Sequence, residues 1–250
     1  MKEQQVQVRT PDGTADAVLV RTDENAAQPG VIVLTDIYGV RPEFVDLAKR
    51  IAEQGYAVLV PNIFYRIAKP PLFDFKPDFQ DDRTKKRVGE LTRPLTLAAM
   101  ERDGAAYVDW LSSQPFVNRA PVGVVGFCFS GRFALATAAA RPERVAAAAS
   151  FHGGGLFTDN VDSPHLVLPR VKAALYFGHA TNDHSMTAEL IEKFEWALRS
   201  WGGEYQSEVY PARHGWMIAG GGAYDAANAE RGFRKMMDVF HESLHSAVSP

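Results

Sequence analysis

Cys128 is the only cysteine among the 250 residues, and its neighbours are those of a reactive group. The segment GFCFSG, residues 126–131, has the form glycine, any residue, nucleophile, any residue, small residue. This form is typical of a nucleophile elbow, a strand-to-helix turn so tight that the residues two before and two after the nucleophile must be small. Such a turn lifts the side chain above the carboxyl ends of the strands and near a helix N-terminus, whose partial positive charge favours a thiolate.

Two other interpretations of this segment stay open. Most free cysteines are small buried hydrophobic residues, and Cys128 could be one of them. Ser130 could be the nucleophile instead, but the residue two positions after it is Arg132, which is too large for an elbow. The motif therefore favours Cys128 as the nucleophile. This interpretation requires partner residues elsewhere in the sequence.

A cysteine nucleophile needs a base, and the base needs a group that orients it. In a fold with a nucleophile elbow these partners follow in the order acid, then histidine, each just after a strand. Asp183 follows the apolar run AALYFG, and His214 follows the run EYQSEVYP. Taken alone, Asp183 could cap a helix that begins near Thr187, and His214 could be an ordinary loop residue. Because all three residue types occur in the required order, we predict that Asp183 and His214 form a catalytic triad with Cys128.

The elements that must position these residues alternate along the chain. Short β-branched runs alternate with longer amphipathic stretches, which indicates βαβ units, a mostly parallel sheet and the α/β fold class. The expected strands are a hairpin over 6–20, turned at residues 11–13, and then 31–35, 57–61, 121–127, 145–151, 173–178 and 204–211. The expected helices are 41–56, 95–113, one through 134–140, 187–201 and 224–241. The charged segment 81–88 is expected to be a solvated helix face.

No internal repeat or change of composition divides the chain, so residues 1–250 are expected to form a single domain. Residues 62–82 have no clear period and are rich in proline and aromatic residues. Loops of this length are usually functional or disordered, and the five aromatic residues between Phe64 and Phe79 favour a packed loop. We expect this loop to be a lid or to line a pocket.

Composition narrows the possible partners. The net charge of −3 gives no reason to expect nucleic acid or an anionic membrane surface. The N-terminus lacks the apolar core of a signal peptide, and no run of about 18 apolar residues occurs, so we expect no membrane partner and a cytoplasmic location. A lone cysteine can form neither an internal disulfide nor a multi-thiolate zinc site. A small-molecule substrate, no cofactor, and a monomer or homodimer are expected.

Two histidine-containing segments resemble known functional motifs but are not expected to be catalytic or metal-binding. The segment FHGGG, residues 151–155, resembles a lipase oxyanion motif, but that motif belongs before the nucleophile. We therefore expect a glycine-rich exit from a strand, with His152 lining or capping the site. His179 and His184 flank Asp183, yet no further ligands accompany them, so no metal site is expected.

Together these residues resemble the dienelactone hydrolase family, which are α/β-hydrolases with a cysteine nucleophile. The similarity runs over nearly the whole chain and includes TDIYGV (35–40), the GFCFSG elbow, the Asp183 loop and the HGW segment at 214–216. The resemblance implies an α/β-hydrolase fold and hydrolysis of a small ester or lactone through an acyl-enzyme on Cys128. His214 would move the proton, and Asp183 would hold its ring.

The resemblance also implies roles for residues around the triad. The backbone N–H groups of Ile37 and Phe129 would form the oxyanion hole. Asp36 stands where the family has a glutamate that contacts the resting thiol. Aspartate is one methylene shorter, so the same contact could be lost or bridged by water. The expected substrate-binding residues are Tyr38, Phe127, His152, Arg213, Trp216 and Ile218.

One departure bears on the substrate. Family members that cleave dienelactone carry an arginine four residues after the catalytic histidine, which binds the substrate carboxylate; here that position is Ile218. Arg213, Arg83 or Arg87 could supply a cation instead. A broad carboxylesterase or thioesterase for uncharged substrates and a non-catalytic ligand-binding protein of the same fold therefore stay open as alternatives.

Overall fold

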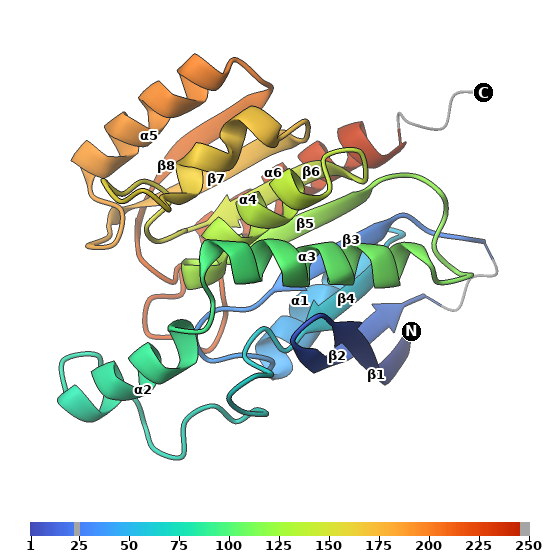
Figure 1. Ribbon diagram of the computed structural model, residues 1–250, viewed down its shortest axis with the longest axis horizontal. Coiled ribbons are helices and arrows are strands. Elements are labelled where there is room, and N and C mark those ends of the chain that lie inside the picture. Colours follow the sequence, from blue (N-terminus) through green and yellow to red (C-terminus); the bar gives the residue numbers. More distant parts are fainter. Residues whose placement is uncertain (23–25, 246–250) are drawn as a thin grey trace.

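Eight strands form one sheet at the centre of the computed structural model, which describes residues 1–22 and 26–245 (Figure 1). Their order across the sheet is β1-β2-β4-β3-β5-β6-β7-β8. The strands are β1 Lys2–Thr10, β2 Gly13–Arg21, β3 Gly30–Leu34, β4 Ala57–Pro61, β5 Val122–Phe127, β6 Val145–Phe151, β7 Ala174–Asn182 and β8 Tyr205–Arg213.

The sheet is mostly parallel, as the sequence predicts. The hairpin β1–β2 is antiparallel, with Lys2 opposite Arg21, and β2 is antiparallel to β4. Every other neighbouring pair, from β4 to β8, is parallel. Strands β3, β4 and β5 are buried at every residue, which explains their continuous apolar sequences, because a parallel sheet is covered on both faces. The predicted α/β-hydrolase fold class is confirmed.

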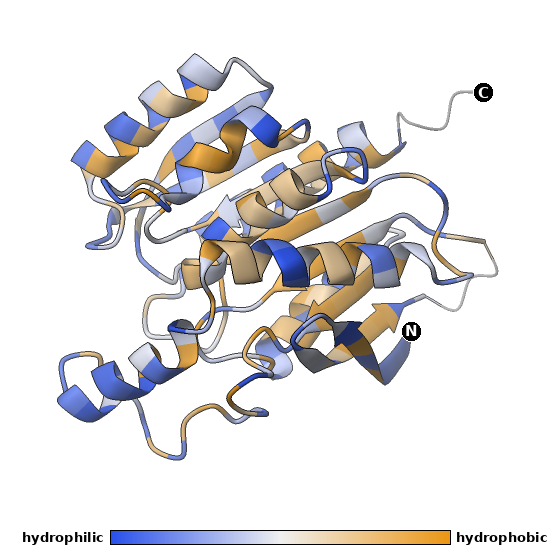
Figure 2. Ribbon diagram, viewed as in Figure 1, coloured by the Kyte–Doolittle hydropathy of each residue, from blue (hydrophilic) through white to orange (hydrophobic). Residues whose placement is uncertain are grey.

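Helices cover both faces of the sheet. Helices α3 (Leu97–Ser112), α4 (Gly131–Ala140) and α5 (Ala188–Trp201) lie on one face, in front of the strands in Figure 1. Helices α1 (Pro42–Ala52) and α6 (Ala226–His245) cover the other face. In Figure 2 the central strands are mainly hydrophobic, whereas α5 carries many hydrophilic residues toward its outside. The hydrophobic core is thus divided into two layers by the sheet.

Local sequence signals set several helix boundaries. Helix α5 begins after Thr187, whose hydroxyl accepts from the N–H of Leu190, and ends at Gly202 in the left-handed region with φ 73°. Asp183 is therefore not the cap of this helix. The segment expected as a solvated helix face is part of α2 (Asp82–Thr92), whose N-cap Asp81 accepts from the N–H of Thr84 at 2.7 Å.

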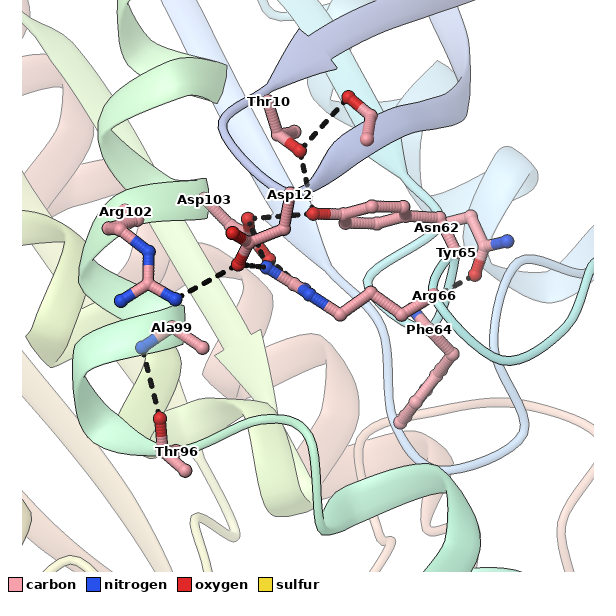
Figure 3. A network of polar contacts seen from close by, with 11 residues as sticks. Thr10, Asp12, Asn62, Phe64, Tyr65, Arg66, Thr96, Ala99, Arg102 and Asp103 are labelled. Atoms are coloured by element: carbon pink, nitrogen blue, oxygen red, sulfur yellow. Dashed lines mark hydrogen bonds and ion pairs between the residues drawn. The ribbon is translucent and has the colours of Figure 1, made fainter.

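The long segment after β4 begins with turns at residues 62–68 that a buried ion pair holds against α3 (Figure 3). Asp103 of α3 is completely buried and accepts two hydrogen bonds from Arg66, at 2.6 and 2.9 Å. The hydroxyl of Tyr65 donates to the same carboxylate at 3.0 Å. Farther along, the rings of Phe73 and Phe79 contact Tyr38 at centroid distances of 5.7 and 6.0 Å. The segment is thus anchored at its start by the ion pair and contacts Tyr38 through two of its rings.

Candidate active site

A cavity of about 530 Å³ lies where the loops after β3, β5, β6, β7 and β8 meet. Because the carboxyl ends of parallel strands lie at one edge of the sheet, residues far apart in sequence come together here. The volume is in the range of small-molecule sites, which is about 300–1,000 Å³. Its walls include Ile37, Tyr38, Phe79, Cys128, Phe129, Arg132, His152, Asp183, His214 and Ile218.

Cys128 has the backbone geometry of a nucleophile elbow. It lies between β5 and α4, at the start of a single 3₁₀ turn (Cys128–Ser130), and is partly exposed to the cavity. Its φ is +56°, a left-handed conformation that L residues rarely adopt and that functional sites often retain. A Cβ at Gly126 would lie 2.1 Å from the carbonyl oxygen of Ser130, so the turn requires glycine there.

Ser130 is a structural residue of the elbow. Its side chain is completely buried, accepts from the N–H of Phe127 at 2.8 Å, and has the carbonyl oxygens of Leu34 and Phe127 at 2.8 and 3.0 Å. These contacts fix the hydroxyl between β3 and β5 and away from the cavity walls. The alternative of a serine nucleophile at this position therefore loses its basis.

Asp183 and His214 are joined by a short hydrogen bond beside Cys128. Asp183 Oδ2 lies 2.6 Å from His214 Nδ1, and Oδ1 accepts from the N–H and hydroxyl of Ser185 at 2.8 and 2.6 Å. His214 is fixed further by its own N–H, which donates to the carbonyl oxygen of Asn182 at 3.1 Å. His214 and Cys128 line the same cavity, and the Cys128 side chain is among the causes that raise the pKa of the imidazole. The structure thus brings together the three residues that the sequence predicts as a triad.

The electrostatics of this cluster favour a charged imidazole. Burial lowers the pKa of His214, but hydrogen bonds to Asp183 and Cys128 and the charges of both outweigh it and raise that pKa to about 10. Burial raises the pKa of Asp183, but the hydrogen bond and charge of His214 and the two bonds from Ser185 lower it below its ordinary value. At neutral pH the pair is therefore an imidazolium beside a carboxylate.

The two expected oxyanion donors flank Cys128. Phe129 is the next residue in the turn before α4, where the first N–H groups of a helix lack intrahelical carbonyl partners. Ile37 comes from the loop after the neighbouring strand β3 and lines the same cavity. Among the described backbone hydrogen bonds, none uses the N–H of Ile37. Both residues line the cavity beside Cys128, and their role as oxyanion donors stays a prediction.

Asp36 does not have the contact that the resemblance implies for it. Its carboxylate forms a bidentate ion pair with Arg41, with Oδ1 and Oδ2 at 2.6 and 2.8 Å from the two guanidinium nitrogens. Oδ1 also accepts from the N–H of Tyr38 at 2.9 Å. No contact with the thiol is found among these partners, because the short side chain turns toward Arg41. The expected thiol contact is thus replaced by a paired carboxylate in the cavity wall.

The expected substrate-binding residues divide into two groups. Tyr38, His152 and Ile218 line the cavity. Phe127 and Trp216 are completely buried and do not: Phe127 packs between Phe44 and Phe151, and Trp216 stacks on Tyr210 at 4.2 Å. Both belong to the core layer that α1 and α6 cover, where their rings are buried. Their expected substrate contact is not supported.

Arg213 also lies outside the cavity walls. Its guanidinium donates to the carbonyl oxygen of Gly222 at 2.8 Å on the exposed surface. Arg83 and Arg87, the other cations that the sequence offers, lie on α2 beside a separate surface depression. None of these three arginines is placed to contact a molecule in the cavity.

Phe79, an aromatic residue of the loop that the sequence predicts as a lid or pocket lining, reaches the cavity. Sequence reasoning missed two residues of the site. Ser185 supports Asp183 from two residues on, a local turn pattern that Asp favours. Arg132 lies one helical turn after Cys128, and this spacing could have predicted its place in the same cavity.

The structure also bears on metal sites and membrane-spanning helices. Within residues 1–22 and 26–245, no cluster of three or more His, Cys, Asp or Glu side chains is arranged to hold a metal ion. His179 is buried against Phe177 and Phe194, and burial lowers its pKa to about 4. No helix in the described part of the chain has the length and apolar character needed to cross a membrane.

Comparison with known proteins identifies relatives of this chain. The sequence model of the Dienelactone hydrolase family matches residues 15–244. The chain is 35% identical over 141 residues to a carboxymethylenebutenolidase of Rhodococcus opacus, covering 56% of this chain and 50% of that one. It is 27% identical over 183 residues to a carboxymethylenebutenolidase of Pseudomonas putida, covering 73% and 72% of the two chains.

A solved structure from Klebsiella pneumoniae, named for dienelactone hydrolase, is similar with a TM-score of 0.85. The match covers 96% of this chain and 98% of the other chain at 22% sequence identity. At this identity the similarity is evidence for the fold only. The family match covers most of the sequence and includes every residue of the cluster around Cys128. The resemblance found in the sequence is thereby confirmed: the chain belongs to the dienelactone hydrolase family and is an ester hydrolase of that type.

Proposed function

We propose that this hydrolase cleaves a small ester or lactone through an acyl-enzyme intermediate on Cys128. The observation that carries the proposal is the position of Cys128. It stands in a strained turn at the cavity wall, with His214 at its side chain and Asp183 behind His214. A nucleophile, a base and an orienting group within reach of one another are what acyl transfer needs.

Acylation begins from the thiolate of Cys128 beside the imidazolium of His214. The sulfur attacks the substrate carbonyl carbon, a C–S bond forms, and negative charge develops on the carbonyl oxygen. The N–H groups of Ile37 and Phe129 stabilise that oxygen, and one such donor is typically worth about 10²–10³ in rate. The intermediate collapses, the C–O bond breaks, and the departing alkoxide takes the proton from His214. A lactone would open, with its alcohol still attached.

Deacylation restores the resting pair. His214, now neutral, takes a proton from a water molecule, and the hydroxide attacks the thioester carbonyl. The second tetrahedral intermediate collapses with loss of the Cys128 thiolate, and the carboxylic acid product leaves. The proton taken from water stays on His214, so the imidazolium beside the thiolate is regenerated. Asp183 holds the ring by its Nδ1 in both halves of the reaction.

The cavity and the relatives support the proposed substrate class. A volume of about 530 Å³ suits a small molecule. The named relatives are carboxymethylenebutenolidases, which supports a lactone or a comparable ester as substrate. A carboxylesterase or thioesterase for uncharged compounds is the alternative within enzymes, since Ile218 makes part of the cavity wall apolar.

The test is hydrolysis of 4-nitrophenyl acetate by the wild type, Cys128→Ala and Cys128→Ser, with the mass of the protein measured during turnover. We expect activity to fall by at least about 10³-fold in Cys128→Ala, as for removal of other triad nucleophiles. We also expect a wild-type mass gain of one acetyl group, localised to Cys128 by peptide mapping. Equal activity in the wild type and Cys128→Ala would refute the proposal. Tight substrate binding without turnover would instead support the non-catalytic alternative.

A further inference from the structure

Arg41 joins the end of the loop after β3 back to its start. It is the N-cap residue of α1, and its guanidinium donates to both carboxylate oxygens of Asp36, at 2.6 and 2.8 Å. The same guanidinium donates to the carbonyl oxygen of Gly39 at 3.3 Å. A bidentate Arg–carboxylate pair fixes orientation as well as distance, so Arg41 determines where Asp36 lies relative to α1.

The turn within this loop surrounds the N–H of Ile37 with fixed groups. The N–H of Gly39 donates to the carbonyl oxygen of Asp36 at 3.0 Å, and the N–H of Tyr38 donates to Asp36 Oδ1 at 2.9 Å. Gly39 has a φ of +75°, and a Cβ there would lie 2.7 Å from Leu72, so the turn requires glycine at this position. Among the hydrogen bonds of residues 1–22 and 26–245, none uses the N–H of Ile37. The turn therefore holds the Ile37 peptide and leaves its N–H available.

We propose that Arg41 positions the oxyanion hole, because its pair with Asp36 holds the loop in the conformation in which Ile37 can donate to the substrate carbonyl oxygen. This inference rests on the proposed function, since that N–H has a role only if a carbonyl is attacked at Cys128. Arg41 is a positioning residue here, because it acts through the loop. The inference also gives Asp36 a role other than contact with the thiol.

The pair is largely removed from water. The side chains of Arg41 and Asp36 are 23% and 11% exposed. Separation of the two would leave a poorly solvated charge on each side, which opposes any movement of Asp36 toward the thiol. The guanidinium carbon also lies 4.7 Å from the centre of the Phe44 ring of α1 and 5.2 Å from that of Tyr38 in the loop. Arg41 is thus in contact with both the loop and the helix that follows it.

The same geometry separates Asp36 from the ionisation of Cys128. Both carboxylate oxygens are bound by Arg41, and Oδ1 also accepts from the N–H of Tyr38. The ionisation of the thiol is then left to His214, which lines the same cavity. Loss of the pair should therefore slow the attack on a carbonyl group without changing the ionisation of the thiol.

The first experiment compares an ester with its thiono analogue, in which sulfur replaces the carbonyl oxygen. 4-Nitrophenyl acetate and O-4-nitrophenyl thionoacetate release the same alcohol and differ at the atom that enters the oxyanion hole. Sulfur is a weak hydrogen-bond acceptor, so a displaced N–H donor costs the ester more than the thionoester. The measured quantity is kcat/KM for the ester divided by kcat/KM for the thionoester. This ratio is independent of the fraction of folded enzyme, so a poorly folding variant still gives an answer.

We expect this ratio to fall about 10- to 100-fold in Arg41→Met and in Asp36→Ala, since a misplacement of about 1 Å can cost about 10²-fold. The double variant should keep the ratio of Asp36→Ala within about threefold, because both substitutions break one interaction. Glu43→Gln is the matched control. It removes the other carboxylate paired with Arg41, at 3.3 Å from Nε, and should change the ratio less than about twofold. A ratio unchanged in either single variant, or losses that multiply in the double variant, would overturn the inference.

A second measurement reports the thiolate without an oxyanion. The rate of alkylation of Cys128 by iodoacetamide follows the thiolate fraction, so its pH dependence gives the pKa of the thiol. The double variant Asp36→Ala with Arg41→Met removes one charge of each sign, and we expect the midpoint to stay within about 0.5 pH units of the wild type. A midpoint shifted by more than about one unit would mean that the carboxylate acts on the thiol, and the inference would fail.

Hydrogen exchange separates this inference from the proposed function. Exchange in a peptide that spans residues 36–44 should become at least about tenfold faster in Arg41→Met, while peptides from β8 keep the wild-type rate. If Cys128→Ala kept wild-type turnover while this difference held, the acyl-enzyme proposal would fail and the ordering of the loop by Arg41 would stand. If Cys128 were acylated while Arg41→Met changed neither the exchange nor the ratio, the proposed function would stand and this inference alone would fail.

Discussion

His152 accepts a hydrogen bond from the backbone N–H of Cys128 through its Nδ1, at 3.2 Å, from the loop after the neighbouring strand β6. Both residues have positive φ angles, 56° for Cys128 and 39° for His152, so two strained residues support each other. The bond requires an unprotonated Nδ1. Burial and the charge of His214 hold the pKa of His152 well below its ordinary value, which keeps the ring neutral. His152 is thus a positioning residue for the nucleophile.

Replacing His152 tests this role. His152→Phe removes the acceptor and leaves the N–H of Cys128 unsatisfied, which costs about 1–3 kcal/mol and should lower kcat/KM by roughly 10- to 100-fold. His152→Asn is the matched variant, since its side-chain oxygen can stand near the position of Nδ1. We expect it to recover most of the activity and of the thermal stability. Equal losses in the two variants would show that the ring, rather than its acceptor, matters.

The charge on His214 predicts the alkaline limit of the reaction. The leaving alkoxide needs the imidazolium proton, and the pKa of His214 is raised to about 10. The value of kcat/KM for an alkyl ester should therefore hold through neutral pH and decline as the pH approaches about 10. Asp183→Asn removes the carboxylate that supports this charge, so the decline should move toward neutral pH and the rate should fall by about 10²–10⁴. Asp82→Asn, on the exposed face of α2, is the control.

The same shift predicts how the triad contributes to stability. The pKa of His214 is raised above its ordinary 6.5, so its contribution to folding is fully present below that pH and is lost as the pH rises toward about 10. The difference in free energy of unfolding between the wild type and His214→Ala should accordingly shrink over that interval. The pKa of Asp183 is lowered instead, so its contribution is present above 3.8 and is lost as the pH falls through the folded-state value. Urea unfolding at several pH values measures both.

Ser130→Ala distinguishes a structural serine from a catalytic one. The buried hydroxyl is the partner of the N–H of Phe127 and of the carbonyl oxygen of Leu34. Its removal should lower the free energy of unfolding by about 1–3 kcal/mol, since buried polar groups lose their partner. The acyl group should still appear on Cys128. Ser200→Ala, which removes an exposed hydroxyl bonded to Trp196, should stay within about 0.5 kcal/mol of the wild type. Loss of acylation in a folded Ser130→Ala protein would contradict this assignment.

The sequence predicted what local rules determine. The tight turn requires Gly126 and a small residue at position 130. Asp183 and His214 follow β7 and β8, and the carboxyl ends of parallel strands lie at one edge of the sheet. These constraints act over a few residues, so the elbow, the alternation of elements and the triad loops could be found without coordinates. Strand and helix ends differed from expectation by a few residues, as at β7, which continues to Asn182.

The sequence did not predict the contacts of side chains that have several possible partners. Asp36 could reach the thiol or Arg41, and only the fold shows that the guanidinium takes both carboxylate oxygens. Phe127 is adjacent to the nucleophile in sequence, yet the alternation of a strand sends its ring to the opposite face. Only the size of Arg132 was considered from the sequence. Whether an arginine forms an ion pair depends on the positions of the neighbouring loops, which the sequence does not give.

Asp103 and Arg66 offer a test of how the segment after β4 is held to the body. The carboxylate is fully buried, and the guanidinium that pairs with it is 14% exposed. Asp103→Ala would leave that charge without its main partner, which should lower the free energy of unfolding by about 3–5 kcal/mol. Asp109→Ala on the same helix breaks an exposed pair with Arg141 and should cost less than about 1 kcal/mol. Adding Arg66→Met to Asp103→Ala should restore part of the lost stability in urea unfolding, because no unpaired charge then remains. If the double variant were less stable than Asp103→Ala by the full cost of Arg66→Met alone, the two residues would not be coupled and this account of the anchor would be wrong.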